Sequence, residues 1–239
     1  MLALNKTASG AVTNTGAAEV IVDGGVFVNS TATDALNQNG SATMKMNWAK
    51  IRGGANLGGA FGIYLSGTGT VAKQIDIVKD LYTSGAGQAV AGAFNIGGNV
   101  TNGASINMTG NPMNVGGNFN NSGAATVVSS QLLIVGNIIN GGSGSFTSEN
   151  MVVGGNIVAD GASWFKPATG KTQNLTVKGN ITLSGSAQIG RTNSDKLFMA
   201  GLLSKGGGSS VKSTVTNSVV QQPTFSVTIP EMADPLATV

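Results

Sequence analysis

Four short stretches in the middle of the chain share one pattern: FNIGGNV (residues 94–100), MNVGGNF (113–119), LLIVGNI (132–138) and MVVGGNI (151–157). A fifth stretch, LTVKGNI (175–181), has the same Gly-Asn pair followed by an apolar residue. The asparagines of the five stretches are Asn99, Asn118, Asn137, Asn156 and Asn180. Three of their spacings are 19 residues and the last is 24. Similarity at a fixed short period indicates a solenoid, in which each repeat stacks on its neighbours.

Apolar residues keep the same register around these anchors. Counted from each asparagine, positions −5, −3, +1 and +9 are apolar in every repeat, and Asp80 and Leu202 extend the frame on either side. Positions −5 and −3 share one face of a strand, because strand side chains alternate. Nineteen residues are too few for a pair of helices but enough for two or three short strands. The sequence therefore predicts an all-β fold, a right-handed parallel β-helix (β-solenoid) with coils of about 19 residues and an irregular C-terminal tail.

The Gly-Asn pair is expected to turn the chain, because these two residues tolerate left-handed backbone angles. Repeated once per coil, the five asparagines are expected to stack as a structural amide ladder, inside the solenoid or at its corner. The sequence assigns them no ligand.

Changes in regularity along the chain predict three parts. Residues 1–60 form irregular coils or a cap, residues 61–218 form the regular β-solenoid, and residues 219–239 form an extended, proline-containing tail. Within the tail, FSVTI (225–229) alternates like an edge strand. We expect it to pair with another subunit.

Composition disfavours an enzyme. The chain has no Cys and no His, so the usual catalytic base and the usual metal ligands are missing. The acidic residues Asp80, Glu149, Asp160 and Asp195 fall at different positions of the repeat and do not stack. We expect no catalytic residue, no cofactor and no metal. A net charge of +3 with two Trp and two Tyr also disfavours nucleic-acid binding. No apolar run is long enough for a membrane span, and an export signal is not evident in this chain.

Two insertions interrupt the period near the C-terminal end. They are KPATGKTQN (166–174) and GRTNSDK (190–196), and they fall at the same corner of adjacent coils. Residues 80–165 contain no Lys or Arg, whereas these insertions carry Lys166, Lys171, Arg191 and Lys196. The four cations form a candidate interaction edge for an anionic polymer such as a polysaccharide, for a membrane surface or for a partner subunit. Ordinary solvated loops are the alternative interpretation.

The two ends resemble a known family. LALNKTASGAV (2–12) and VDGGVFVNSTATDALNQNGSA (22–42), together with ADPLA (233–237), resemble TadE/TadG-like proteins of tight-adherence (Flp) pilus systems. Relatives often carry cysteines near these strings, where this chain has Gly24 and Gly25. The regular centre lies outside this resemblance, and VVGGNIV (152–158) and LTVKGNI (175–181) look like bactofilins and the rods of adhesins.

The resemblance implies a pilus-associated or cell-envelope structural protein at the bacterial cell surface or outside the cell, with a membrane anchor upstream of this chain. The expected partners are further copies of the chain or other pilus and envelope subunits. An adhesin-like module for an anionic polysaccharide and a bactofilin-like polymer are the alternatives. A polysaccharide-active β-helix enzyme is a further alternative that the scattered carboxylates disfavour.

Overall fold

The protein is described by a computed structural model covering residues 1–65 and 73–231. All regular secondary structure in these residues is β-strand, arranged as three parallel sheets of eleven, ten and ten strands. We call them sheets A, B and C. Each coil of the chain contributes one strand to A, one to B and one to C, and then begins the next coil in A.

The strands of sheet A are, in spatial order, β1 (Leu2–Ala3), β4 (Gly25–Val28), β7 (Trp48–Ile51), β10 (Gln74–Ile77), β13 (Ala93–Ile96), β16 (Met113–Val115), β19 (Gln131–Ile134), β22 (Asn150–Val153), β25 (Asn174–Val177), β28 (Lys196–Met199) and β31 (Thr214–Asn217). Sheet B contains β2 (Val12–Asn14), β5 (Leu36–Gln38), β8 (Ala55–Leu57), β11 (Leu81–Thr83), β14 (Val100–Asn102), β17 (Phe119–Asn121), β20 (Ile138–Asn140), β23 (Ile157–Ala159), β26 (Ile181–Leu183) and β29 (Leu203–Lys205). Sheet C contains β3 (Glu19–Ile21), β6 (Thr43–Met46), β9 (Gly62–Leu65), β12 (Gly87–Val90), β15 (Ser105–Thr109), β18 (Ala124–Val128), β21 (Ser143–Thr147), β24 (Trp164–Lys166), β27 (Gln188–Ile189) and β30 (Ser210–Val211).

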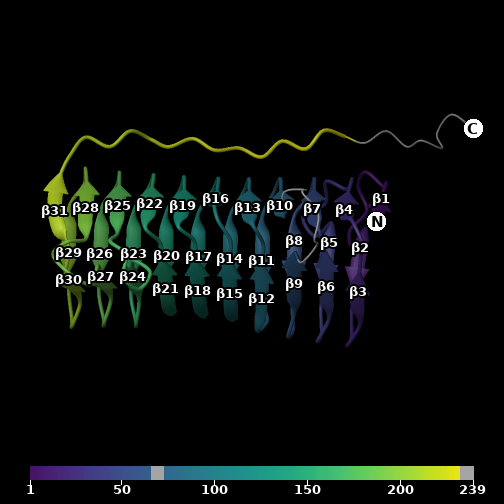
Figure 1. Ribbon diagram of the computed structural model, residues 1–239, viewed down its shortest axis with the longest axis horizontal. Helices are drawn as coiled ribbons and strands as arrows, with labels where there is room; N and C mark the ends of the chain where they lie inside the picture. Colours follow the sequence, from purple (N-terminus) through teal and green to yellow (C-terminus); the bar gives the residue numbers. More distant parts are fainter. Residues whose placement is uncertain (66–72, 232–239) are drawn as a thin grey trace, which may run out of the picture.

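These coils stack into a rod, with β1 at one end and β31 at the other (Figure 1). At about 4.8 Å per coil, the stack is about 45 Å long. The predicted fold class is confirmed: the chain is an all-β parallel solenoid with 19-residue steps through its centre, followed by a tail that forms no strand in the described residues.

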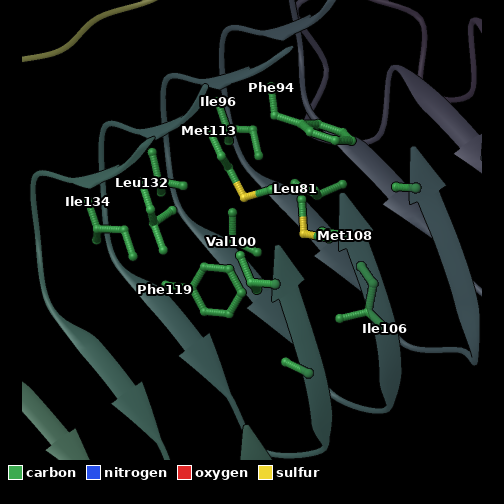
Figure 2. Packing of buried hydrophobic residues seen from close by; sticks show 14 of the residues in the cluster. Leu81, Phe94, Ile96, Val100, Ile106, Met108, Met113, Phe119, Leu132 and Ile134 are labelled. Atoms are coloured by element: carbon green, nitrogen blue, oxygen red, sulfur yellow. The ribbon is translucent and has the colours of Figure 1, made fainter. Parts of the chain in front are cut away.

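The four predicted apolar columns point into the solenoid, as Figure 2 shows for its central coils. Positions −5 and −3 come from sheet A, position +1 from sheet B and position +9 from sheet C. Their side chains are buried from the Asp80 coil to the Asn180 coil. In the core, the Phe146 ring meets Phe119 edge-on at 5.2 Å and stacks on Phe165 at 5.0 Å. Only stacking covers these side chains, because a single coil has two open sides.

Residues 2–65 belong to the same stack. They form three coils whose strands pair continuously with the regular part, although the steps from Leu2 to Phe27 and from Phe27 to Lys50 are 25 and 23 residues. The expected boundary between residues 60 and 61 falls inside the third of these coils, just before β9. Gly25 packs directly beneath Trp48, and a Cβ added there would lie 1.9 Å from the indole ring. This packing accounts for the glycine at residue 25.

The tail returns along the outside of the rod. After β31, residues 218–231, which we call the strap, run back toward the N-terminal coils (Figure 1). The FSVTI segment (225–229) forms no strand within this chain, and its expected pairing with another subunit stays a prediction. It crosses the stacked coils rather than running beside one strand, so its backbone meets no strand ladder in the described residues. Residues 233–237, which carry part of the family resemblance, lie outside the described residues.

Candidate functional site

The five repeat asparagines line the corner between sheets A and B. The backbone N–H of each donates to the side-chain oxygen of the anchor one coil earlier, at 2.6–2.9 Å. The series begins at the Asp80 carboxylate and ends at the N–H of Leu202, 2.8 Å from Asn180 Oδ1. We call it the corner ladder. The side-chain oxygen supplies an acceptor to a backbone N–H that lies at the corner between two strands.

The glycine before each asparagine is required by space. A Cβ at Gly117, Gly136 or Gly155 would lie 2.4–2.5 Å from the ladder oxygen of the preceding coil. None of these glycines has a positive φ, and no described residue other than glycine has one. The expectation that Gly-Asn supplies left-handed angles is therefore wrong. The glycine leaves room for the side-chain oxygen of the preceding coil, and that oxygen accepts a hydrogen bond from the N–H of the asparagine.

A second ladder, which is not among the predictions from the sequence, lies inside the solenoid. It consists of Asn102, Asn121 and Asn140 at the ends of β14, β17 and β20, all at most 3% exposed. Asn102 Nδ2 donates to Asn121 Oδ1 at 2.6 Å, and Asn121 Nδ2 donates to Asn140 Oδ1. Thr83 and Ser163 complete this inner ladder at its two ends.

Each inner amide also donates to the carbonyl two residues further along its own coil, at 2.8–3.1 Å. The buried amides are therefore paired both along and within the coils, as buried polar groups must be. A signal for this ladder exists in the sequence, because all three asparagines occupy position +3 of the repeat. It is masked by Ala159 and Leu183, which occupy the same position in later coils.

The two carboxylates on one coil, Asp76 and Asp80, belong to hydrogen-bonded rows. Asp76 is 7% exposed and accepts from Gln74 Nε2 at 2.6 and 2.7 Å and from Asn95 Nδ2 at 2.8 Å. Asn114 continues this row with a 2.9 Å bond to Asn95 Oδ1. Asp80 begins the corner ladder. Both acids thus supply acceptors to amides of the next coil.

Of the four candidate cations, two meet over one aromatic ring. Lys166 Nζ lies 4.0 Å from the centroid of the Trp164 ring, and the Arg191 guanidinium carbon lies 5.5 Å from it. Such contacts hold a cation against the negative face of the ring. Burial lowers the pKa of Lys166 below its ordinary value, and the positive charge of Arg191 lowers it further. We call Trp164, Lys166 and Arg191 the basic cluster.

The other two cations lie elsewhere on the same corner. Lys171 is exposed and closes a turn, with its N–H 3.1 Å from the carbonyl oxygen of Ala168. Lys196 is exposed at the start of β28 in sheet A, where it pairs with Asn174. The structure therefore places both insertions at the corner between sheets C and A, but it brings only Lys166 and Arg191 into one cluster.

A buried carboxylate joins the two insertions. Asp195 is 1% exposed and accepts hydrogen bonds from the N–H groups of Gln173 at 2.8 Å, Arg191 at 2.6 Å and Thr192 at 3.2 Å. Backbone donors of this kind stabilise a carboxylate away from water. Gln173 belongs to the first insertion and Arg191 to the second. The Asp195 carboxylate therefore links the two insertions and positions the backbone of Arg191.

No family model matches the chain, and no curated protein or solved structure shows significant similarity to it. In the described part of the chain, no three acidic, His or Cys side chains are grouped closely enough to hold a metal ion. The same residues contain no helix of the length and apolarity needed to cross a membrane.

Proposed function

We propose that the chain is a structural component of a bacterial cell surface, pilus-associated or filament-forming, that acts through contacts with further subunits. The observation that carries this proposal is the open end of the solenoid at its C-terminal coil. Strands β29, β30 and β31 are the last in their sheets, so each has a strand partner on one side only in the described chain. Unpaired parallel edges of this kind favour the addition of a further strand.

Exposed apolar side chains on that end favour the same association. Val215 pairs in register with the buried Leu197, so it occupies a core column, yet it is 43% exposed because no coil covers it. Leu202, at the last corner position, is 77% exposed. A second copy or another envelope subunit that stacks here would bury both side chains and continue the three sheets.

A substitution at the open end tests this proposal. Val215→Asp puts a charge in the core column of the last coil and is expected to abolish end-to-end assembly seen by electron microscopy and sedimentation. Thr216→Asp adds the same charge to the neighbouring, outward-facing position and is expected to leave assembly intact. Equal assembly by the two variants, or no assembly by the unmodified chain at any concentration, would contradict the proposal.

The pilus-associated role and the bactofilin-like alternative differ in compartment. The same end-to-end association supports both, whereas the family resemblance of the termini favours the cell surface. Labelling of intact cells with a membrane-impermeant amine reagent separates them. The proposed surface protein is labelled in intact cells, and an intracellular polymer is labelled only after lysis.

Binding of an anionic polysaccharide is a second candidate function, favoured by the basic cluster. The ion pairs in the described chain use Lys6, Lys45 and Arg52 as their cations, and Lys166 and Arg191 belong to none of them. Two like charges held side by side repel each other, and an anion between them removes that repulsion. A uronic-acid carboxylate has the charge for this position.

A further inference from the structure

The strap lies on the corner between sheets A and B, along a row of glycines that we call its channel. Its alternate residues Pro223, Phe225 and Val227 are half-buried and Ile229 is 7% exposed, whereas Thr224, Ser226 and Thr228 face solvent. Position −2 of the repeat, which the strap crosses, is Gly97, Gly116 and Gly154 in three of the coils. A Cβ at Gly154 would lie 2.9 Å from Pro223 Cδ, and one at Gly97 would lie 3.5 Å from Val227 Cβ. Glycine at this position thus leaves room for the strap.

The far end of the strap is held by charge. Glu231 lies 2.5 Å from Lys6 Nζ and 3.7 Å from Arg52 Nη1, which belong to the N-terminal coils. Between this end and β31, Gln222 Nε2 donates to the carbonyl oxygen of Val135 at 2.9 Å. The strap therefore reaches from the last coil to the first ones and is attached by side chains rather than by a strand ladder.

The start of the strap is loosely packed. Val219 is 97% exposed, directly after the Ser218 N–H bonds to the Met199 carbonyl oxygen at 2.9 Å. Beneath it lies an open crevice lined by Lys178, Met199, Ala200 and residues 217–220. A segment with little buried apolar surface and a solvent-exposed backbone opens at low free-energy cost. The segment around Val219 is therefore the part of the strap at which separation from the coils can begin.

We propose that the strap is an exchangeable arm, which in the assembled protein docks into the channel of a second copy and places Glu231 beside that copy's Lys6 and Arg52. The channel of a second copy is chemically identical, so the interactions that the strap makes within its own chain can all be re-formed between chains. The exchange is a lateral contact that adds to the end-to-end stacking proposed above, because only two parallel rods lying side by side keep the direction in which each strap runs. The exposed Val219 then lies at the crossing point between the copies, where the second copy covers it.

This inference rests on the proposed assembly role, and the native ion pairs provide a test that separates the two. Light and heavy-isotope chains are mixed, unfolded, refolded together and sedimented. The assembled fraction is then treated with a carbodiimide, which links a Lys amine to a carboxylate it touches. The Lys6–Glu231 product is expected to contain light–heavy pairs in the statistical proportion. The Lys45–Glu19 pair, also at 2.5 Å but between neighbouring strands of one solenoid, is the internal control and stays light–light or heavy–heavy.

Each outcome of this experiment decides between the alternatives. Mixed Lys6–Glu231 pairs with unmixed Lys45–Glu19 pairs support exchange, and Glu231→Gln should remove the first product only. Unmixed Lys6–Glu231 pairs in an assembled fraction overturn the exchange while leaving the assembly role standing. The absence of an assembled fraction contradicts the assembly role itself.

Discussion

The side-chain oxygen of Asn118 lies 2.8 Å from the backbone N–H of Asn137, one coil further along the solenoid. It also accepts from Asn137 Nδ2 at 2.9 Å. One acceptor thus satisfies a backbone group that the corner would leave unpaired and orients the next member of the ladder. Asp80 does the same for Asn99, with a carboxylate in place of the amide.

Asn118→Ala is expected to destabilise the solenoid by about 1–2 kcal/mol, because it leaves the N–H of Asn137 without an acceptor. Asn118→Asp keeps the acceptor, as Asp80 shows, and is expected to cost less. Denaturant unfolding followed by circular dichroism measures both changes. Asn120→Ala, on the solvent side of β17, is the control. Equal losses for the alanine variants at residues 118 and 120 would contradict the role of the ladder.

Gly136→Ala and Gly141→Ala form a matched pair that tests why glycine precedes the corner asparagines. A Cβ at Gly136 meets Asn118 Oδ1 at 2.4 Å and the Gly117 carbonyl oxygen at 2.7 Å, so we expect a loss of about 1–3 kcal/mol. At Gly141 a Cβ meets nothing within 4 Å, and φ is not left-handed. Alanine there is expected to be neutral or stabilising by about 0.4–1 kcal/mol, since it restricts the unfolded chain. A similar unfolding midpoint for both variants would refute the packing explanation.

Asn121→Leu tests the inner ladder. Leucine removes the acceptor of Asn102 Nδ2 and the donor to Asn140 Oδ1, and each buried group left unpaired costs about 1–3 kcal/mol. Leu183 shows that the same repeat position accepts leucine where no amide lies next to it. Leu183→Asn, which buries an amide beside Ala159, is therefore expected to destabilise as well. Tolerance of leucine at residue 121 would mean that the inner amides contribute little.

Periodicity was sufficient to predict the fold and the core. The columns containing Ile96, Val115, Ile134 and Val153 are visible because burial selects the same residue class in every coil. The reason for Gly-Asn was not accessible, because a requirement for space and one for backbone angle select the same residue. The inner ladder was hidden because Asn is common in this chain and Leu183 interrupts its column.

The strap and the basic cluster were only partly predictable, for a different reason. The alternation of FSVTI (225–229) is visible in the sequence, but a sequence does not show whether such a segment pairs with a strand edge or lies across a row of glycines. The two insertions were located at one corner, yet which cations meet depends on Trp164 and Asp195. Trp164 and Asp195 are not repeated from coil to coil, so no periodic pattern in the sequence reveals them.

The ion pairing of Glu231 with Lys6 and Arg52 predicts that strap attachment depends on pH. The hydrogen bond and charge of Lys6, with a smaller effect of Arg52, hold the pKa of Glu231 below its ordinary value of 4.5. A lowered carboxyl pKa means that this contribution is complete above pH 4.5 and is lost as the pH falls through the lowered value. Hydrogen exchange at residues 225–229 should therefore show less protection in acid.

Glu231→Gln is the matched variant for this measurement. The Gln side chain cannot ionise, so residues 225–229 of this variant should already be less protected from hydrogen exchange at neutral pH. Their protection should not fall further in acid through the titration of residue 231. Because the ion pair is exposed, high salt should weaken it in the unmodified chain as well. The same pH dependence in the Gln variant would mean that another group controls the strap.

The basic cluster predicts selective binding of acidic polysaccharides. Lys166→Gln with Arg191→Gln, and Lys171→Gln with Lys196→Gln, remove the same charge from the same corner. If net charge alone attracts the polymer, both double variants should lose binding equally. If the pair over Trp164 binds a carboxylate, the first double variant should lose most of the binding, because Lys166 and Arg191 both contact the Trp164 ring.

Co-sedimentation with a uronic-acid polysaccharide, with a neutral dextran for comparison, measures the effect. Binding by the unmodified chain should weaken as salt rises, since exposed charges are screened beyond about 10 Å at 0.1 M ionic strength. Trp164→Ala keeps both cations but removes the ring that holds them, so it should weaken binding while leaving net charge unchanged. Full binding by Trp164→Ala would show that the cations act independently of the ring. Equal loss of binding in the two double variants would mean that this corner attracts the polymer through its net positive charge alone.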